Sequence, residues 1–461
     1  MAILNLHTAF GLSLFTALPL IILLVGIALS ASYIIYNLYF HPLRDYPGPK
    51  LWAATNLPYA KTWLSGKQSF IIPHLHEKYG EIVRVAPNRL SYTDPAAWRD
   101  IRGHRKAGQG ENGKDVDFYF FSRFTMLGAN REDHTRARRA LAHGFSAKVM
   151  QEQYPLIAQY IDLLINRLRT LVQKNNDQPT TVNIVSWFNF TTFDIIGDLA
   201  FGAPFDCLAT SSYHPWINTL FNSVGQFGMM VAARWYIPRL LPVLRKVLGI
   251  GKPQQQQGDF ASQQISKRLE LTTGRPDFVD ALFNAKTEDG VTLTRQEIDQ
   301  NMRLVVLAGS ETTATALSGA TYFVCKHPDV QKRLAAEVRG AFRREEEIDM
   351  HSVQKLKYML AVLEEAMRMY PPVPPALPRT CQPGGDVICG RHVPEGTMLD
   401  IWAWAMSYSS KNFALADEFH PERWLDADDG SRDPRFVNDR REAVEPFSVG
   451  PRNCIAWHMW R

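Results

Sequence analysis

The residue with the clearest chemical potential is Cys454, near the carboxyl end, in the run from Phe447 to Ala456 (FSVGPRNCIA). Gly450 and Pro451 favour a tight loop, after which Cys454 stands where a helix could begin. Backbone N–H groups at a helix start stabilise a thiolate, the form of cysteine that binds metals and acts as a nucleophile. Because an isolated cysteine is usually a small buried hydrophobic residue, the interpretation depends on the surrounding loop.

A second group of reactive residues interrupts an apolar helical pattern at positions 308–313 (AGSETT). Glu311 would be costly to bury without a partner, and Gly309 weakens the helix by about 1 kcal/mol relative to alanine. The Thr312 hydroxyl, beside an acid and a weakened turn, could hold water and relay protons. The alternative is an ordinary helix whose threonine hydroxyls bond carbonyls of the preceding turn.

Glu365 and Arg368 lie three residues apart in the run EEAMR, a spacing that lets them pair on one helix face. Alone this is a common surface feature. If Arg423, in the run PERW, reaches the same carboxylate, the three residues form a buried Arg–Glu–Arg cluster, which specifies geometry more than it adds stability.

A fourth group is basic and consists of His134 and Arg138, four residues apart, together with Arg379 and Arg452. Arginine is suited to bidentate recognition of carboxylates. Each of these arginines taken singly is more typical of a solvated surface.

The elements that position these residues are predicted to be mostly helical. Thr294-x-x-Glu297 is a capping box, and a helix is expected from Arg295 to Lys326, before Pro328. Apolar spacing predicts further helices over 150–174, 184–201 and 328–342. Short β-like runs occur at 82–85 and 387–401. We therefore expect a mainly α fold with small β-sheets. The run 254–257 (QQQQ) is expected to be a low-complexity loop.

The amino terminus predicts a membrane anchor over residues 1–43, because no charged side chain precedes Arg44 and 10–40 is overwhelmingly apolar. Positive residues follow this stretch, which places the remainder on the cytoplasmic side. The proline-rich segment 44–58 is expected to act as a hinge that sets the angle between the anchor and the domain 59–461. A cleaved signal peptide is the alternative. Residues 227–250 are either core helix or a second surface that dips into the membrane.

Composition narrows the class of function. The net charge of +5 is spread among 46 acidic residues, which argues against nucleic acid as a partner. Five scattered cysteines favour a reducing compartment over a disulfide framework.

Together these residues resemble the cytochrome P-450 family of microsomal haem-thiolate monooxygenases. Phe447, Gly450, Arg452 and Cys454 match its haem-binding loop. Glu365 and Arg368 match its ExxR pair, Arg423 matches the third partner, and 308–313 matches its oxygen-activation segment. The runs AGSETTATALSGATY and FTTFDIIGDLAFG are similar to fungal secondary-metabolite oxygenases, including the trichothecene hydroxylase branch.

The resemblance implies a cofactor, roles and partners. Cys454 would ligate the iron of haem b as a thiolate. His134, Arg138, Arg379 and Arg452 would hold the haem propionates, while Glu311 and Thr312 would supply protons on the distal side. Glu365, Arg368 and Arg423 would fix the proximal scaffold. The substrate would be a small hydrophobic metabolite. Its pocket would be lined by parts of 104–126, 227–235 and 373–377, and by Ala308. Electrons would come from an NADPH-cytochrome reductase, which Arg136 and Arg139 would steer to the proximal face. The chain would lie at the endoplasmic reticulum membrane with its catalytic domain in the cytosol.

The sequence departs from the family pattern near its end. Ala456 replaces the usual glycine, and only seven residues follow Cys454 in a chain of 461, where the family continues through a longer helix and a β-hairpin. This predicts either a haem-dependent monooxygenase with a shortened C-terminus or, as the alternative, a truncated and catalytically silent membrane protein with impaired haem binding.

Overall fold

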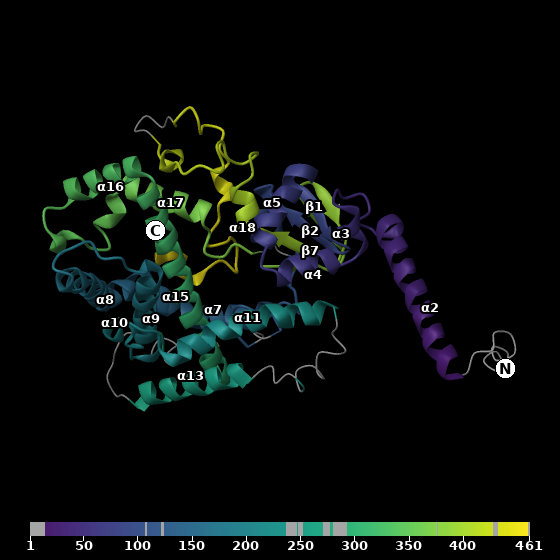
Figure 1. The fold of residues 1–461 in the computed structure, drawn as a ribbon, viewed down its shortest axis with the longest axis horizontal. Coiled ribbons are helices and arrows are strands. Elements are labelled where there is room, and N and C mark those ends of the chain that lie inside the picture. Colours follow the sequence, from purple (N-terminus) through teal and green to yellow (C-terminus); the bar gives the residue numbers. More distant parts are fainter. Residues whose placement is uncertain are drawn as a thin grey trace.

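The computed structural model describes residues 14–459, apart from positions 107, 121–123, 237–246, 248–251, 271–276, 280–292, 376 and 427–431. Helices dominate one end of the body, and a small β-sheet lies at the other end (Figure 1). One apolar helix, α2 (Leu14–Ile35), projects from the sheet end. The mainly α fold with small sheets and one amino-terminal apolar helix is confirmed.

The helical end is built around α15 (Arg295–Lys326), which has the predicted bounds. Its capping box is formed, because Thr294 N donates to Glu297 Oε2 at 2.8 Å and Glu297 N donates to Thr294 Oγ1 at 3.3 Å. The other helices at this end are α7 (Arg131–Ala142), α8 (Ala147–Lys174), α9 (Ile184–Phe201), α10 (Cys207–Thr210), α11 (Pro215–Tyr236), α13 (Lys252–Glu270), α16 (Pro328–Ala341) and α17 (Lys357–Met369).

Helix α9 packs closely along α15, and Gly309 lies at this contact. A Cβ atom added to Gly309 would stand 2.8 Å from Cδ1 of Ile196, closer than side-chain atoms normally approach. Helix α15 is continuous through this point. Gly309 therefore serves close helix packing, and α15 keeps its helical form through this position.

The larger sheet has the strand order β1-β2-β7-β4-β3. Strands β2 and β7 are parallel, whereas the other neighbours are antiparallel. A separate hairpin pairs β5 with β6. The strands are β1 (Ile82–Ala86), β2 (Arg89–Tyr92), β3 (Gly113–Lys114), β4 (Arg379–Thr380), β5 (Asp386–Ile388), β6 (Arg391–Val393) and β7 (Met398–Ile401), and the helices beside them are α3 (Lys50–Ala54), α4 (Leu57–Leu64), α5 (Gln68–Tyr79), α6 (Ala96–Arg102) and α18 (Ala403–Ser407).

The predicted loop over 254–257 is wrong, because these glutamines lie inside α13. Glutamine is a good helix former, and Pro253 near the amino end of α13 is tolerated in the first turn. Low sequence complexity concealed an ordinary helix. Of the segment 227–250, the part up to Tyr236 belongs to α11, while 237–246 and 248–250 lie outside the described residues.

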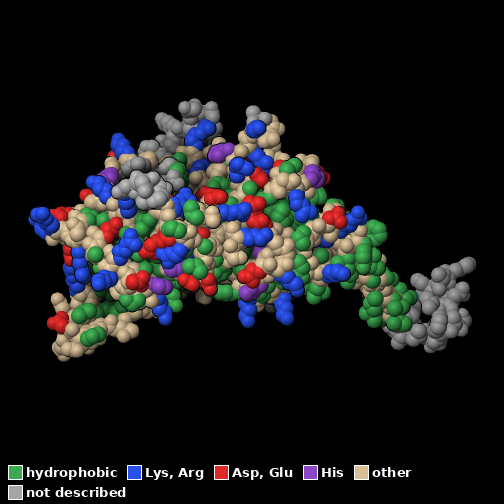
Figure 2. Space-filling model, turned by 90° about the horizontal axis from the view of Figure 1, so that it is seen from above, with side chains coloured by type: hydrophobic (Ala, Val, Ile, Leu, Met, Phe, Trp, Pro, Cys, Tyr) green, Lys and Arg blue, Asp and Glu red, His purple; other side chains and the backbone are tan. Residues whose placement is uncertain are grey.

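The segment Leu18–Phe40 is long and apolar enough to cross a membrane, with a mean hydropathy of 2.5. Figure 2 shows hydrophobic side chains covering the described part of this projecting helix.

A buried polar clasp joins the base of α2 to the body. The helix ends in a π-helical turn, Tyr36–Phe40, where Asn37 Nδ2 donates to Ala54 O at 2.9 Å. Arg84 of β1 donates to Asn37 O at 3.0 Å and twice to Pro87 O, at 3.0 and 2.7 Å. Burial lowers the pKa of Arg84 to about 10.

Candidate active site

The loop before Cys454 turns in a way that requires glycine. Gly450 has φ 80°, and a Cβ atom there would lie 1.9 Å from the carbonyl oxygen of Arg102. The loop closes where Cys454 N donates to Phe447 O at 2.8 Å, and a 3₁₀ helix, Ile455–Met459, follows. The thiol is exposed on one side. Desolvation by the surrounding atoms raises its pKa, against the Ala456 backbone N–H and the Arg138 guanidinium.

Two arginines tie this loop to the rest of the body. Arg138 of α7 donates to the main-chain oxygen of Asn453 and to its Oδ1, both at 2.6 Å. Arg452 donates to Ala129 O and to Glu111 Oε1, both at 2.9 Å. Helix α7 therefore fixes the position of the residue that precedes Cys454.

Beside the loop, basic side chains gather from five segments of the chain. We call this group the cation cradle: the cations Arg102, Lys114, Arg379 and Arg452, with the imidazole of His134 beside them. Arg379 has 6% of its surface exposed and Arg102 has 8%. The Nε atoms of Arg102, Arg379 and Arg452 are buried and have no hydrogen-bond partner.

The pKa values of the cradle show mutual repulsion. Burial, followed by the charges of Arg379, Arg452 and Arg102, lowers the pKa of Lys114 well below its usual value. Burial lowers the pKa of Arg379 to about 10, and neighbouring cations add to the effect. Burial and neighbouring cations lower the pKa of His134 to about 3. Buried like charges with unpartnered N–H groups fit an anion that carries more than one negative charge.

Of the four basic residues singled out in the sequence, His134, Arg379 and Arg452 meet in the cradle, whereas Arg138 is engaged by Asn453. Arg102 and Lys114 were missed. Lys114 lies in the two-residue strand β3, too short to show a pattern. Its pairing with Arg379, through β3 and β4, is visible only in the fold.

On α15, burial raises the pKa of Glu311, whose Oε1 is buried and has no hydrogen-bond partner. Thr312 Oγ1 donates to Ala308 O at 2.6 Å, and Thr313 Oγ1 donates to Gly309 O at 3.0 Å. In this structure the threonine hydroxyls therefore make the local bonds of the alternative interpretation, while Glu311 retains an unused acceptor.

The Glu365 cluster is fully buried and closed. Arg368 donates to both carboxylate oxygens of Glu365 at 2.8 Å, and Arg423 donates to Oε1 at 2.9 Å. Trp424 Nε1 and the backbone N–H of His420 also donate to this carboxylate, each at 2.9 Å. These donors lower the pKa of Glu365 against the effect of burial.

A second carboxylate, missed in the sequence, completes the cluster. Asp439 pairs with Arg423 on the side away from Glu365. Arg368 satisfies its remaining donors with the carbonyls of Ser407, Ala416 and Glu418. Two buried cations are thus balanced by two buried carboxylates.

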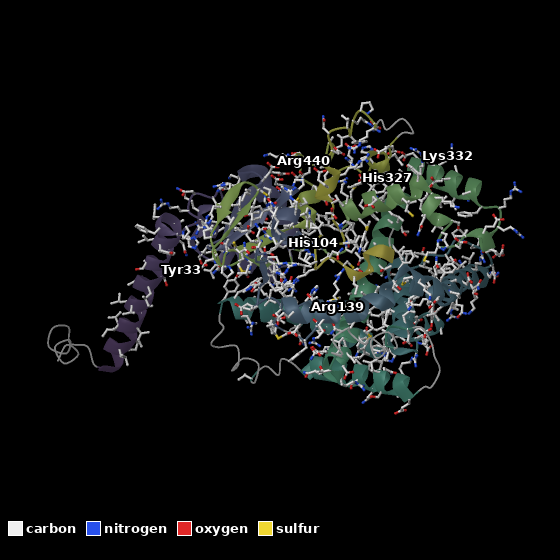
Figure 3. The ribbon with its side chains drawn as sticks, turned by 180° about the vertical axis from the view of Figure 1, so that it is seen from behind. Tyr33, His104, Arg139, His327, Lys332 and Arg440 are labelled. Atoms are coloured by element: carbon white, nitrogen blue, oxygen red, sulfur yellow. The ribbon has the colours of Figure 1, made fainter. Side chains whose placement is uncertain are left out.

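The expected role of Arg136 in steering a partner is weakened by its ion pairs. Arg136 is bound to Glu297 and Asp133, so two carboxylates offset its charge at a partly exposed surface. Its partner Glu297 lies 161 residues away in sequence, which is why the spacing along α7 did not reveal it. Arg139 is exposed on the same helix (Figure 3).

The comparisons identify the family. The family model of cytochrome P450 matches residues 46–456. The chain is therefore a member of the cytochrome P450 family, and its relatives are monooxygenases.

Three of the relatives show the degree of similarity. The chain is 42% identical to a trichothecene C-15 hydroxylase of Fusarium sporotrichioides, over 94% of the chain and 87% of that protein. It is 43% identical to an averantin hydroxylase of Dothistroma septosporum, over 92% and 78%. It is 41% identical to the cytochrome P450 monooxygenase astJ of Aspergillus oryzae, over 92% and 84%. The comparisons give no support to the alternative of a silent protein.

The family implies haem b with a cysteine thiolate ligand, a redox partner and a small-molecule substrate. The described residues fit such a group, because a cysteine on a glycine-dependent loop lies in the same region as a cradle of buried cations in which three guanidinium Nε atoms have no hydrogen-bond partner. Haem carries two propionates, and the cradle is suited to them.

Proposed function

We propose that this chain oxidises a small hydrophobic metabolite, a polyketide, terpenoid or alkaloid, in fungal secondary metabolism, using O2 and electrons from an NADPH-cytochrome reductase. The observation that supports this most is the cation cradle beside the Cys454 loop, in a chain about 40% identical to fungal hydroxylases.

The residues are assigned as follows. When bound, the haem supplies the activation of O2 and the insertion of one oxygen atom into the substrate. Cys454 ligates its iron, and Glu365, Arg368 and Arg423 hold the proximal scaffold on which the Cys454 loop rests. His134, Arg379 and Arg452 would face the propionates, joined by Arg102 and Lys114, and Arg138 would join them by turning from Asn453, to which both its terminal nitrogens donate.

The distal side is assigned to α15. The raised pKa of Glu311 allows its carboxyl group to bind and release a proton closer to neutral pH than an ordinary glutamate. Thr312 can pass that proton only if its hydroxyl leaves the carbonyl of Ala308, to which it donates. Proton delivery therefore requires the hydroxyl hydrogen of Thr312 to turn away from the Ala308 carbonyl.

The cellular placement follows from the anchor. Residues 1–43 anchor the chain in the endoplasmic reticulum membrane as a single pass, 44–58 set the angle, and 59–461 form the cytosolic catalytic domain. Lipid is then a partner of the exposed apolar helix Leu18–Phe40. Arg139, exposed on α7, contributes to docking of the reductase.

The test is the reduced carbon-monoxide spectrum of the full chain in microsomes. A red-shifted Soret band of the thiolate type is expected, and Cys454→Ser should abolish it. A chain that takes up no haem, or that gives a histidine-type spectrum, would refute the proposal.

A second test concerns the proton path. Thr312→Ala should keep the haem spectrum but uncouple NADPH consumption from product formation. The matched control Thr313→Ala should keep both the spectrum and the coupling. An unchanged product yield per NADPH in the Thr312 variant would contradict its assigned role.

A further inference from the structure

One carboxylate stands among the cations of the cradle. Glu111 binds Arg452 at 2.9 Å, and its charge also acts on Lys114 and Arg379. A second carboxylate, Asp400, acts on Arg102 but is bound by Arg89 and Tyr59. Glu111 is thus the acid most directly coupled to this group of cations.

The contact fixes the direction of the Arg452 guanidinium. One terminal nitrogen donates to Ala129 O and the other to Glu111 Oε1. With two of the three nitrogens held, the plane of the group is set, and the buried Nε is a donor without a partner. The Arg452 side chain has 5% of its surface exposed and that of Glu111 has 22%, so the pair is largely shielded from solvent.

A fixed negative charge at this place has two electrostatic consequences. It reduces the attraction of the cradle for the propionates, because like charges repel across a poorly solvated region. It also favours the more positive, ferric state of a nearby haem over the ferrous state. If Glu111 only held Arg452 in place, removing its charge would change neither the affinity for the propionates nor the reduction potential in these directions.

We propose that Glu111 is a positioning residue for the haem, which aims Arg452 at a propionate and at the same time lowers the reduction potential of the iron. This inference rests on the proposed haem-thiolate function. Glu111 lies in a loop outside every sequence motif, and it would control both haem retention and the acceptance of electrons by the iron.

Two variants separate the charge of Glu111 from its hold on Arg452. Glu111→Gln keeps an oxygen that can accept from Arg452 but removes the charge. Glu111→Ala removes both. The matched control is Asp386→Asn, because Asp386 is a shielded acid in the same region, bound to Arg105 at 2.6 Å with 10% of its side chain exposed, and it pairs with no cradle cation.

Two quantities are measured. One is the ferric-to-ferrous ratio of the purified haem protein at a fixed solution redox potential, and the other is the rate of haem transfer to apomyoglobin. Glu111→Gln should shift the ratio toward ferrous iron by up to tenfold, which corresponds to about 59 mV for one electron, and should slow haem loss severalfold. Glu111→Ala should shift the ratio similarly but lose haem faster than Glu111→Gln. Asp386→Asn should leave the ratio unchanged.

An unchanged ratio in Glu111→Gln, or a shift toward ferric iron, would overturn the inference while leaving the proposed function intact, provided that the wild-type chain shows the thiolate spectrum. A wild-type chain that never acquires thiolate-ligated haem would overturn the proposed function, and this inference with it.

Discussion

The Glu365 cluster and the cation cradle are both rich in buried arginine, yet their charges are balanced in different ways. In the cluster, Arg368 and Arg423 face Glu365 and Asp439. In the cradle, the cations outnumber their carboxylate partners, and three guanidinium Nε atoms have no hydrogen-bond partner.

The difference separates a structural site from a ligand site. A buried charge without a partner costs several kcal/mol, so a fold tolerates an excess of buried cations when something other than the polypeptide balances them. The cluster is complete within the chain and therefore stabilises it. The cradle weakens the polypeptide alone and favours binding of an anionic group.

The largest effect is expected from Glu365→Gln, which tests whether the cluster is a structural site. The change leaves Arg368 and Arg423 buried without their shared carboxylate, so the free energy of unfolding should fall by about 3–5 kcal/mol. Urea unfolding followed by circular dichroism measures it. Glu345→Gln is the control, because the exposed pair of Glu345 with Arg169 should be worth less than about 1 kcal/mol. Equal effects of the two changes would show that the buried cluster stabilises the fold no more than an exposed ion pair does.

A change in the cradle should act in the opposite direction. Arg379→Met removes a buried cation, so the haem-free chain should gain about 2 kcal/mol in its free energy of unfolding. The same variant should lose haem to apomyoglobin about tenfold faster. Arg368→Met is the control, since it should destabilise the chain. Loss of stability in Arg379→Met would mean that the cradle is already balanced.

The smallest predicted effect is a dependence on pH. His134 has a pKa of about 3 in the folded chain, against 6.5 when unfolded. Below pH 6.5 the unfolded state takes up a proton that the folded state refuses, so stability falls as the pH drops from 6.5 toward 3.

In the haem-free His134→Trp variant this component should be absent. The variant should lose about 1 kcal/mol less than the wild type between pH 6.5 and 5.5, measured by urea titrations at both pH values. Identical losses in the two proteins would show that His134 titrates normally.

Much of the fold could be predicted from local patterns. The capping box at Thr294 and the stop at Pro328 gave the bounds of α15, and helical spacing gave those of α9. Both helices are long, and their apolar periodicity is strong. The run 254–257 misled because its composition suggested a loop although glutamine favours a helix.

The candidate site was predictable only where a motif marks it. Cys454, Glu365 and Arg368 lie in short patterns, whereas Asp439 and Lys114 have no local signature. Their roles arise from contacts between segments far apart in the chain. Arg136 shows the reverse error, since an isolated basic residue on a helix looked free until the fold brought Glu297 to it.

The clasp between Arg84 and Asn37 has a mechanical consequence. Because Arg84 is held by Pro87 and donates to the last turn of the apolar helix, we expect the helix and the body to tilt together. If the helix spans a bilayer, a change in its tilt, for instance in a thicker membrane, would then turn the body with it. The thickness of the lipid would then set the direction in which Arg139 and its surroundings face an approaching electron donor.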